Sequence, residues 1–131
     1  MLKDISFTIQ GKPISTNSCY RARVIKTKNS GASMPVVYMT KEGKEYKRKA
    51  QEIIKQNCSG EPTDKDLVAY IRLNFKDKRR RDIDNYNKIL LDSMTGLIYI
   101  DDKQIQELHL YKKYGCENDS IDVTIMKYEE E

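Results

Sequence analysis

The chain has 131 residues, a length typical of one domain, and we expect residues 1–131 to fold as a single unit. Charged side chains make up 34% of the chain, but the net charge is only +4, so any basic surface must be local. The sequence contains no apolar run of membrane-spanning length, no apolar core of a signal peptide, and no Cys-x-x-Cys pair. Its three separated cysteines and single histidine argue against a zinc site and favour a reduced, cytoplasmic protein.

The first part of the chain predicts a strand, a long loop and a helix. Apolar and polar residues alternate over residues 4–10, which indicates a half-buried strand. Residues 12–35 mix Gly, Ser, Asn and Pro with several cations without a period, and we interpret them as a long basic loop. A short strand is expected over residues 36–39. Thr40 is a candidate N-cap for a helix over about residues 41–56, which has apolar residues at helical spacing.

The middle of the chain contains the clearest strand. Residues 67–75 alternate, and the strand delivers a run of cations and then Asp82 to its C-terminal end. A second helix is expected over residues 85–95, with Gly96 as its C-cap glycine. Lys88 is four residues from both Asp84 and Asp92, which places it one helical turn from each carboxylate. The same spacing also occurs in simple surface ion pairs.

The last part predicts two more strands. Residues 104–114 have an extended pattern, but their apolar residues fall out of phase, and a bulge near Gln106 and Glu107 would restore the phase. A turn over residues 115–119 leads to a final alternating strand over residues 121–125. We therefore predict an α+β fold: a mixed sheet of four or five strands with two main helices.

Two pairs of carboxylates indicate metal-dependent phosphodiester chemistry. Asp82 and Asp84 are spaced by one residue and follow four cations, and Asp101 and Asp102 come from a later turn. Hard divalent cations such as Mg²⁺ bind carboxylate oxygens, polarise phosphate oxygens and activate water. The adjacent cations are what a polyanionic substrate requires. Each feature also has a structural interpretation: an Asp before a helix is often an N-cap, and paired Asp residues are frequent in turns.

Three motifs follow one another in this region. They are Asp82-Ile83-Asp84-Asn85-Tyr86-Asn87-Lys88, Leu91-Asp92-Ser93-Met94-Thr95-Gly96, and Asp101-Asp102-Lys103-Gln104-Ile105. This succession closely resembles the RusA family of Holliday junction resolvases, with a looser match over residues 11–21. The resemblance implies a homodimer that makes paired nicks across a four-way DNA junction, with Mg²⁺, or Mn²⁺ in its place, as cofactor.

The resemblance also implies roles for individual residues. Asp82, Asp84 and Asp102 take the metal-binding roles and count as catalytic together with Lys88, the catalytic lysine. The resemblance gives Asp101 and Asp92 weaker claims and gives Arg81 a supporting basic role.

Candidate DNA contacts occur in two segments. We expect phosphate or base contacts from Lys78, Arg79, Arg80 and Arg81 after the strand, and from Asn17, Tyr20, Arg21 and Arg23 in the predicted basic loop. The structural alternatives are a solvated charged face and a connection without a partner.

Two other functions remain open. The first is a DNA-junction-binding module without activity, which would keep the basic segments but lack productive metal binding. The second is a metal-dependent phosphohydrolase of small phosphate esters, which should not need the basic segments and should depend less steeply on salt.

Overall fold

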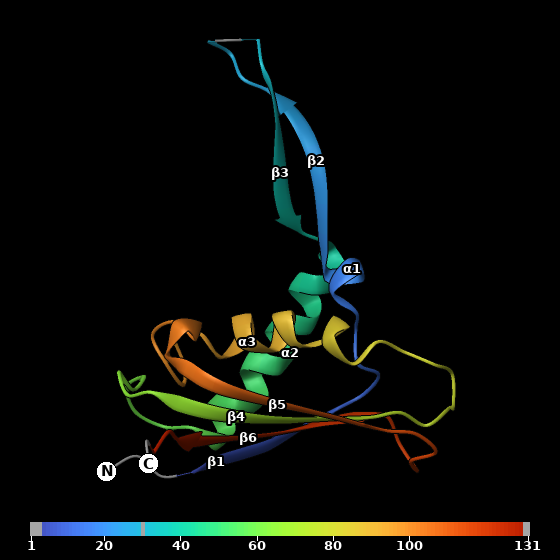
Figure 1. Ribbon diagram of the computed structural model, residues 1–131, viewed down its shortest axis with the longest axis vertical. Coiled ribbons are helices and arrows are strands. Elements are labelled where there is room, and N and C mark those ends of the chain that lie inside the picture. Colours follow the sequence, from blue (N-terminus) through green and yellow to red (C-terminus); the bar gives the residue numbers. More distant parts are fainter. Residues whose placement is uncertain (1–3, 30, 130–131) are drawn as a thin grey trace.

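The computed structural model describes residues 4–29 and 31–129, and its main body is a four-stranded sheet in the order β1-β6-β4-β5 (Figure 1). β4 and β5 run parallel, whereas β1 and β4 both pair with β6 in antiparallel fashion. The strands are β1 (Ile5–Gln10), β4 (Leu67–Asn74), β5 (Ile105–Lys113) and β6 (Ser120–Lys127). This mixed sheet, with its helices, confirms the predicted α+β class.

The alternation of the strands decides which face of the sheet is buried. Ile121, Val123 and Ile125 of β6 are each about 1% exposed, and the residues between them are partly exposed. Leu67 and Leu73 of β4 are buried on the same side. Because β4 and β6 are the inner strands, these side chains form the floor of the core.

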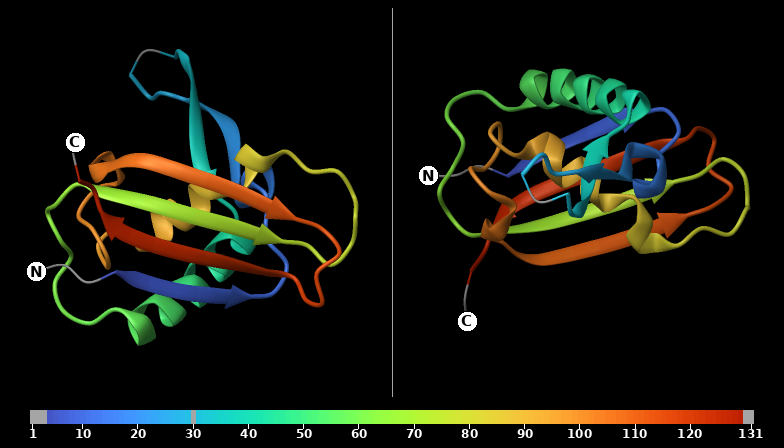
Figure 2. Two further views of the ribbon diagram at one scale, coloured as in Figure 1. Left: turned by 60° about the horizontal axis from the view of Figure 1, so that its bottom comes forward. Right: turned by 90° about the horizontal axis from the view of Figure 1, so that it is seen from above.

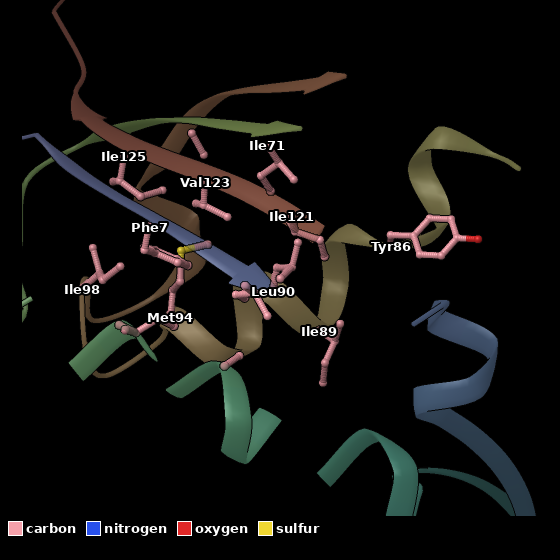
Figure 3. Close-up of a cluster of buried hydrophobic side chains, with 14 of the residues drawn as sticks. Phe7, Ile71, Tyr86, Ile89, Leu90, Met94, Ile98, Ile121, Val123 and Ile125 are labelled. Carbon is pink, nitrogen blue, oxygen red and sulfur yellow. The ribbon is translucent and has the colours of Figure 1, made fainter. Parts of the chain in front are cut away.

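Two helices cover that face of the sheet (Figures 1 and 2). In α2 (Lys41–Asn57), the Thr40 hydroxyl accepts a hydrogen bond from the Gly43 amide at 3.1 Å, which confirms the predicted N-cap. In α3 (Asn87–Met94), Leu90 and Met94 lie in the cluster of apolar side chains above the sheet (Figure 3). None of the helices in the described ranges is long and apolar enough to cross a membrane.

The start of α3 differs slightly from the prediction. A 3-10 turn, η1 (Ile83–Asn85), precedes the helix, and Tyr86 interrupts it with φ −129° and ψ −6°. The Tyr86 ring is 8% exposed and packs edge-on against Phe75, with 5.6 Å between ring centres. The burial of this ring therefore accompanies a break in the helical backbone. Gly96 ends the segment at φ +84°, as expected for a C-cap glycine.

The segment predicted as a long loop, residues 12–35, is largely regular structure, so that prediction was wrong. It contains the short helix α1 (Thr16–Cys19), all of β2 (Tyr20–Lys26) and the start of β3 (Ser33–Met39). β2 and β3 form an antiparallel hairpin that projects away from the sheet and helices (Figure 1). Because both faces of this hairpin are largely exposed, its sequence lacks the alternation that a half-buried strand shows.

The predicted bulge in the fifth strand is confirmed. Ile105 pairs with Leu67 and Glu107 pairs with Val68, which leaves Gln106 as the extra residue. After this shift, Leu108 pairs with Ala69 and Leu110 pairs with Ile71, so both leucines lie on the inner face of the sheet. β5 is an edge strand, so one side of its backbone is unpaired within the sheet.

Candidate active site

The cation run after β4 is held in a fixed loop by Arg81. Its guanidinium donates to both carboxylate oxygens of Asp77, at 2.7 and 3.0 Å, and lies 4.2 Å from the centre of the Phe75 ring. The Arg81 amide donates to the Tyr114 hydroxyl at 2.9 Å, and the Lys112 amino group donates to the Arg81 carbonyl. The Arg81 side chain is only 8% exposed. These contacts favour a structural role for Arg81 over the predicted DNA contact.

The other cations of the run have a different environment. Lys78, Arg79 and Arg80 are all exposed on the loop that Arg81 anchors. Hydrogen bonds from Arg81 hold the pKa of Asp77 well below its usual range, and the same bonds raise the pKa of Arg81. Asp77 and Arg81 therefore both stay ionised, and their opposite charges cancel. Lys78, Arg79 and Arg80 remain as exposed cations that can meet a polyanion.

Asp82 and Asp84 lie at η1, directly after this loop. Both side chains are exposed. Asp82 occupies the N-cap position of η1, but its side chain makes no capping hydrogen bond. The simple capping interpretation is therefore not supported for Asp82, and both carboxylates face solvent beside the cations.

Lys88 lies against Asp92 and Tyr20. The Lys88 amino nitrogen is 3.7 Å from Asp92 Oδ2 and 4.9 Å from the centre of the Tyr20 ring. The Tyr20 hydroxyl donates to the same Asp92 oxygen. Burial raises the pKa of Tyr20 above its ordinary value, and the hydrogen bond to Asp92 adds to the shift. Tyr20 begins β2, so it links the foot of the hairpin to the lysine on α3.

Asp101 and Asp102 lie in a turn that Gln104 anchors. The Gln104 side chain accepts from the amides of Ile100 and Asp101, at 2.9 and 3.0 Å, and donates to the carbonyl oxygens of Thr63 and Lys65, both at 2.8 Å. The turn, η2 (Asp102–Gln104), starts with Asp101 as N-cap, and Asp102 is exposed.

The Asp101 side chain caps the η2 turn. Its carboxylate accepts from the Lys103 amide at 2.9 Å, and this bond lowers the pKa of Asp101. Of the two adjacent carboxylates, Asp101 is therefore the one with the capping role. The sequence pattern marked Gln104, but its anchoring contacts could not be inferred from that pattern.

The structure does not bring all the predicted metal ligands together. Arg81, just before Asp82, contacts Lys112 near the end of β5, whereas Asp102 precedes the start of β5. A nine-residue strand spans about 25 Å, and η1 and η2 lie at opposite ends of α3 (Figures 1 and 2). Among the described residues, no group of three or more His, Cys, Asp or Glu side chains is placed to hold a metal ion. Within one chain, therefore, Asp82 and Asp84 do not form a metal site with Asp102.

The DNA contacts predicted for residues 12–35 lie partly on α1, at the base of the hairpin, and partly on the strand β2. Asn17 is exposed on α1, and Arg21 and Arg23 are exposed on β2. The Arg23 guanidinium lies 5.4 Å from the centre of the Tyr38 ring, on the same face as Arg21. Tyr20 instead is half-buried against Asp92, which favours a positioning role over base stacking.

A comparison with protein families identifies the class of enzyme. A family model for endodeoxyribonuclease RusA matches residues 11–126, most of the chain. The protein is therefore an endodeoxyribonuclease, an enzyme that hydrolyses phosphodiester bonds in DNA. More particularly, it belongs to the RusA family, which is a family of Holliday junction resolvases. Comparison with curated proteins finds no match.

Proposed function

We propose that this protein resolves four-way DNA junctions by paired nicks, with Mg²⁺ as its cofactor. The observation that carries the proposal is the position of two exposed carboxylates, Asp82 and Asp84, immediately after a loop of exposed cations that Arg81 holds in place. The cations supply attraction for the DNA backbone, and the carboxylates supply oxygen ligands for a hard cation. Without the cations, the carboxylates would repel the substrate.

Mg²⁺ bound at these carboxylates would polarise the scissile phosphate and lower the pKa of water. Lys88 is the proposed catalytic lysine, and its ammonium would stabilise negative charge that develops on the phosphate. Asp102 is the proposed third ligand, but it does not reach Asp82 and Asp84 within one chain. A complete ligand set therefore requires a second copy.

The proposed homodimer is supported by the edge position of β5. Asp82 and Asp84 lie near the C-terminal end of this strand, and Asp102 precedes its N-terminal end. If two copies meet antiparallel along their β5 edges, the two opposite ends come together. Asp82 and Asp84 of one copy would then face Asp102 of the other, which forms two equivalent sites related by twofold symmetry. Two sites are what paired nicks require.

We also propose that the protein acts in the cytoplasm. Cys19, Cys58 and Cys116 are all free, which suits a reducing compartment.

The proposed function is tested by mixing the purified protein with a synthetic four-way junction and Mg²⁺, beside a linear duplex of the same sequence and a chelator control. We expect paired nicks in the junction alone, lost with the chelator. Binding without cutting would indicate an inactive junction-binding module. Neither binding nor cutting would contradict the proposal and would direct attention to small phosphate esters.

A further inference from the structure

We propose that the phosphate backbone of one DNA strand runs through a basic trough beside Asp82, and that Lys12 and Lys112 are phosphate contacts in it. This inference rests on the proposed function and names the surface on which the substrate strand lies. Neither lysine belongs to the three motifs that carry the proposed catalytic residues, although Lys12 lies within the looser match over residues 11–21, and the two lysines are 100 positions apart in the sequence.

The trough consists of two neighbouring hollows of about 700 and 320 Å³. Both are lined by Ser15, Arg81 and Tyr86, so they adjoin each other over a shared floor. Asp82 lines the larger hollow. A strand that follows the trough is therefore led to the first of the proposed catalytic carboxylates.

Each hollow has its own pair of exposed cations. Arg80 and Lys112 line the larger hollow, and Lys12 and Arg79 line the smaller one, so consecutive arginines of the loop serve different hollows. The Lys112 amino group donates one hydrogen bond to the Arg81 carbonyl, which leaves two of its three N–H groups for a phosphate. Asp82 lines the larger hollow and Glu42 the smaller one, so two carboxylates offset two of the four positive charges. Arg81 adds no net charge to the floor because Asp77 neutralises it.

Several side-chain contacts hold the floor of the trough, and this favours binding. Arg81 is held by Asp77, Phe75 and Tyr114, and the Tyr86 ring is buried beside η1 (Figure 3). Cations on such an anchored loop lose less conformational freedom when they contact a ligand than cations on a mobile loop.

A repeating polyanion fits this arrangement better than a single small phosphate does. One phosphate group would need one pair of cations, whereas this surface offers two pairs in succession, with half-buried Ser15 between them. A DNA strand presents phosphates at a regular spacing and can engage both pairs at once.

The test measures the affinity of the protein for a four-way junction over a range of salt concentrations. For Lys12→Ala and for Lys112→Ala, we expect the slope of log affinity against log salt to become shallower by about 0.7 to 0.9, the loss of one phosphate contact. Lys12→Arg and Lys112→Arg keep the charge and should restore the slope. The matched controls are Lys55→Ala, near the end of α2, and Lys127→Ala, at the end of β6, which are exposed outside the trough.

The outcomes separate this inference from the proposed function. If the Lys12 and Lys112 variants keep the wild-type slope, as the controls should, the trough inference is wrong and the proposed function stands. If the wild-type protein does not bind the junction at all, the proposed function itself fails. Thermal unfolding of each variant shows whether a changed slope reflects a lost contact or a lost fold, and an arginine variant that folds but keeps the shallow slope counts against the inference.

Discussion

At the scale of single residues, Lys88 is held by side chains from two elements: Asp92 from its own helix and Tyr20 from the foot of the hairpin. We expect Lys88→Ala to lower the junction cleavage rate by about 100-fold, because a group that stabilises developing charge is lost. Tyr20→Phe keeps the ring but removes the hydrogen bond to Asp92. We expect it to lower the rate by about tenfold, the effect of one hydrogen bond to a charged group.

Single-turnover cleavage and junction binding, measured side by side, check this expectation. A positioning role predicts that Tyr20→Phe lowers the cleavage rate while affinity for the junction is kept. The matched control is Tyr38→Phe, which removes a hydroxyl from an exposed tyrosine of the hairpin. A Tyr20→Phe variant that cleaves at the wild-type rate would show that Lys88 does not depend on this contact.

The Asp77–Arg81 pair makes a prediction about pH. Hydrogen bonds from Arg81 lower the pKa of Asp77 in the folded protein. A lowered folded-state pKa contributes stability that is complete above the unfolded pKa of about 3.9 and is lost as the pH falls through the folded value. We expect the free energy of unfolding of Asp77→Asn to lie below that of the wild type by a constant amount at neutral pH. The two free energies of unfolding should begin to converge below about pH 4 and continue to do so as the pH falls toward the lowered pKa of Asp77.

Denaturant unfolding at neutral and acidic pH measures this difference. If the gap between wild type and Asp77→Asn stays the same in acid, the pair does not stabilise the loop through its charges. Arg81→Lys serves as a second check, since it keeps the charge and loses the paired hydrogen bonds.

The sequence proposed residues for the site but did not show the contacts that those residues make. The resemblance of the three motifs to the RusA family assigned roles to Asp82, Asp84, Lys88 and Asp102, and the carboxylate spacing beside the cations pointed to the same chemistry. The sequence did not show that Arg81 is committed to Asp77 or that Tyr20 reaches Asp92. These contacts join residues through side-chain packing, and packing has no period that a sequence pattern can show.

At the scale of elements, the hairpin carries both of its arginines on one face. Opposite residues of an antiparallel pair share a face, so Arg21, Arg23 and Tyr38 lie on one face of the β2–β3 ribbon, and Ala22, Val24 and Val37 lie on the other. We expect alanine at both Arg21 and Arg23 to weaken junction binding and to reduce the salt slope by about 0.9 per lost phosphate contact.

Salt-dependent junction binding measures this effect, and the opposite face supplies the control. Val24 is 69% exposed and Val37 is 67% exposed, so threonine at both positions should leave the ribbon and its junction affinity unchanged. Equal loss of affinity in both double variants would mean that the ribbon contributes through its shape or through another partner, not through the arginine face.

Elements that bury one face were predicted well, and the hairpin was not. The strand β6 and the helix α2 each show the period of a half-buried element, and the out-of-phase residues of β5 were sufficient to locate the bulge near Gln106 and Glu107. β2 and β3 carry apolar and charged residues on exposed faces, so neither strand alternates clearly. Their pairing is specified by the partner strand, which a pattern within one segment does not describe.

At the scale of the whole molecule, the parallel connection from β4 to β5 determines where the carboxylates lie. The chain leaves the C-terminal end of β4, passes through η1 and α3, and returns to the N-terminal end of β5. Asp82 and Asp84 belong to the start of this connection, and Asp102 belongs to its end. The sequence placed all three in one site because it could not give the topology that separates them.

The most direct test of this account is complementation between two inactive variants on a four-way junction with Mg²⁺. Asp82→Asn and Asp102→Asn should each abolish cleavage alone, because each removes a ligand from both sites of the dimer. After the two variants are refolded together, each mixed dimer should have one intact site, with Asp82 from one chain and Asp102 from the other. Such a dimer should nick one strand of the junction. If the mixture stays inactive although mixed dimers form and bind the junction, the site shared between two copies is contradicted.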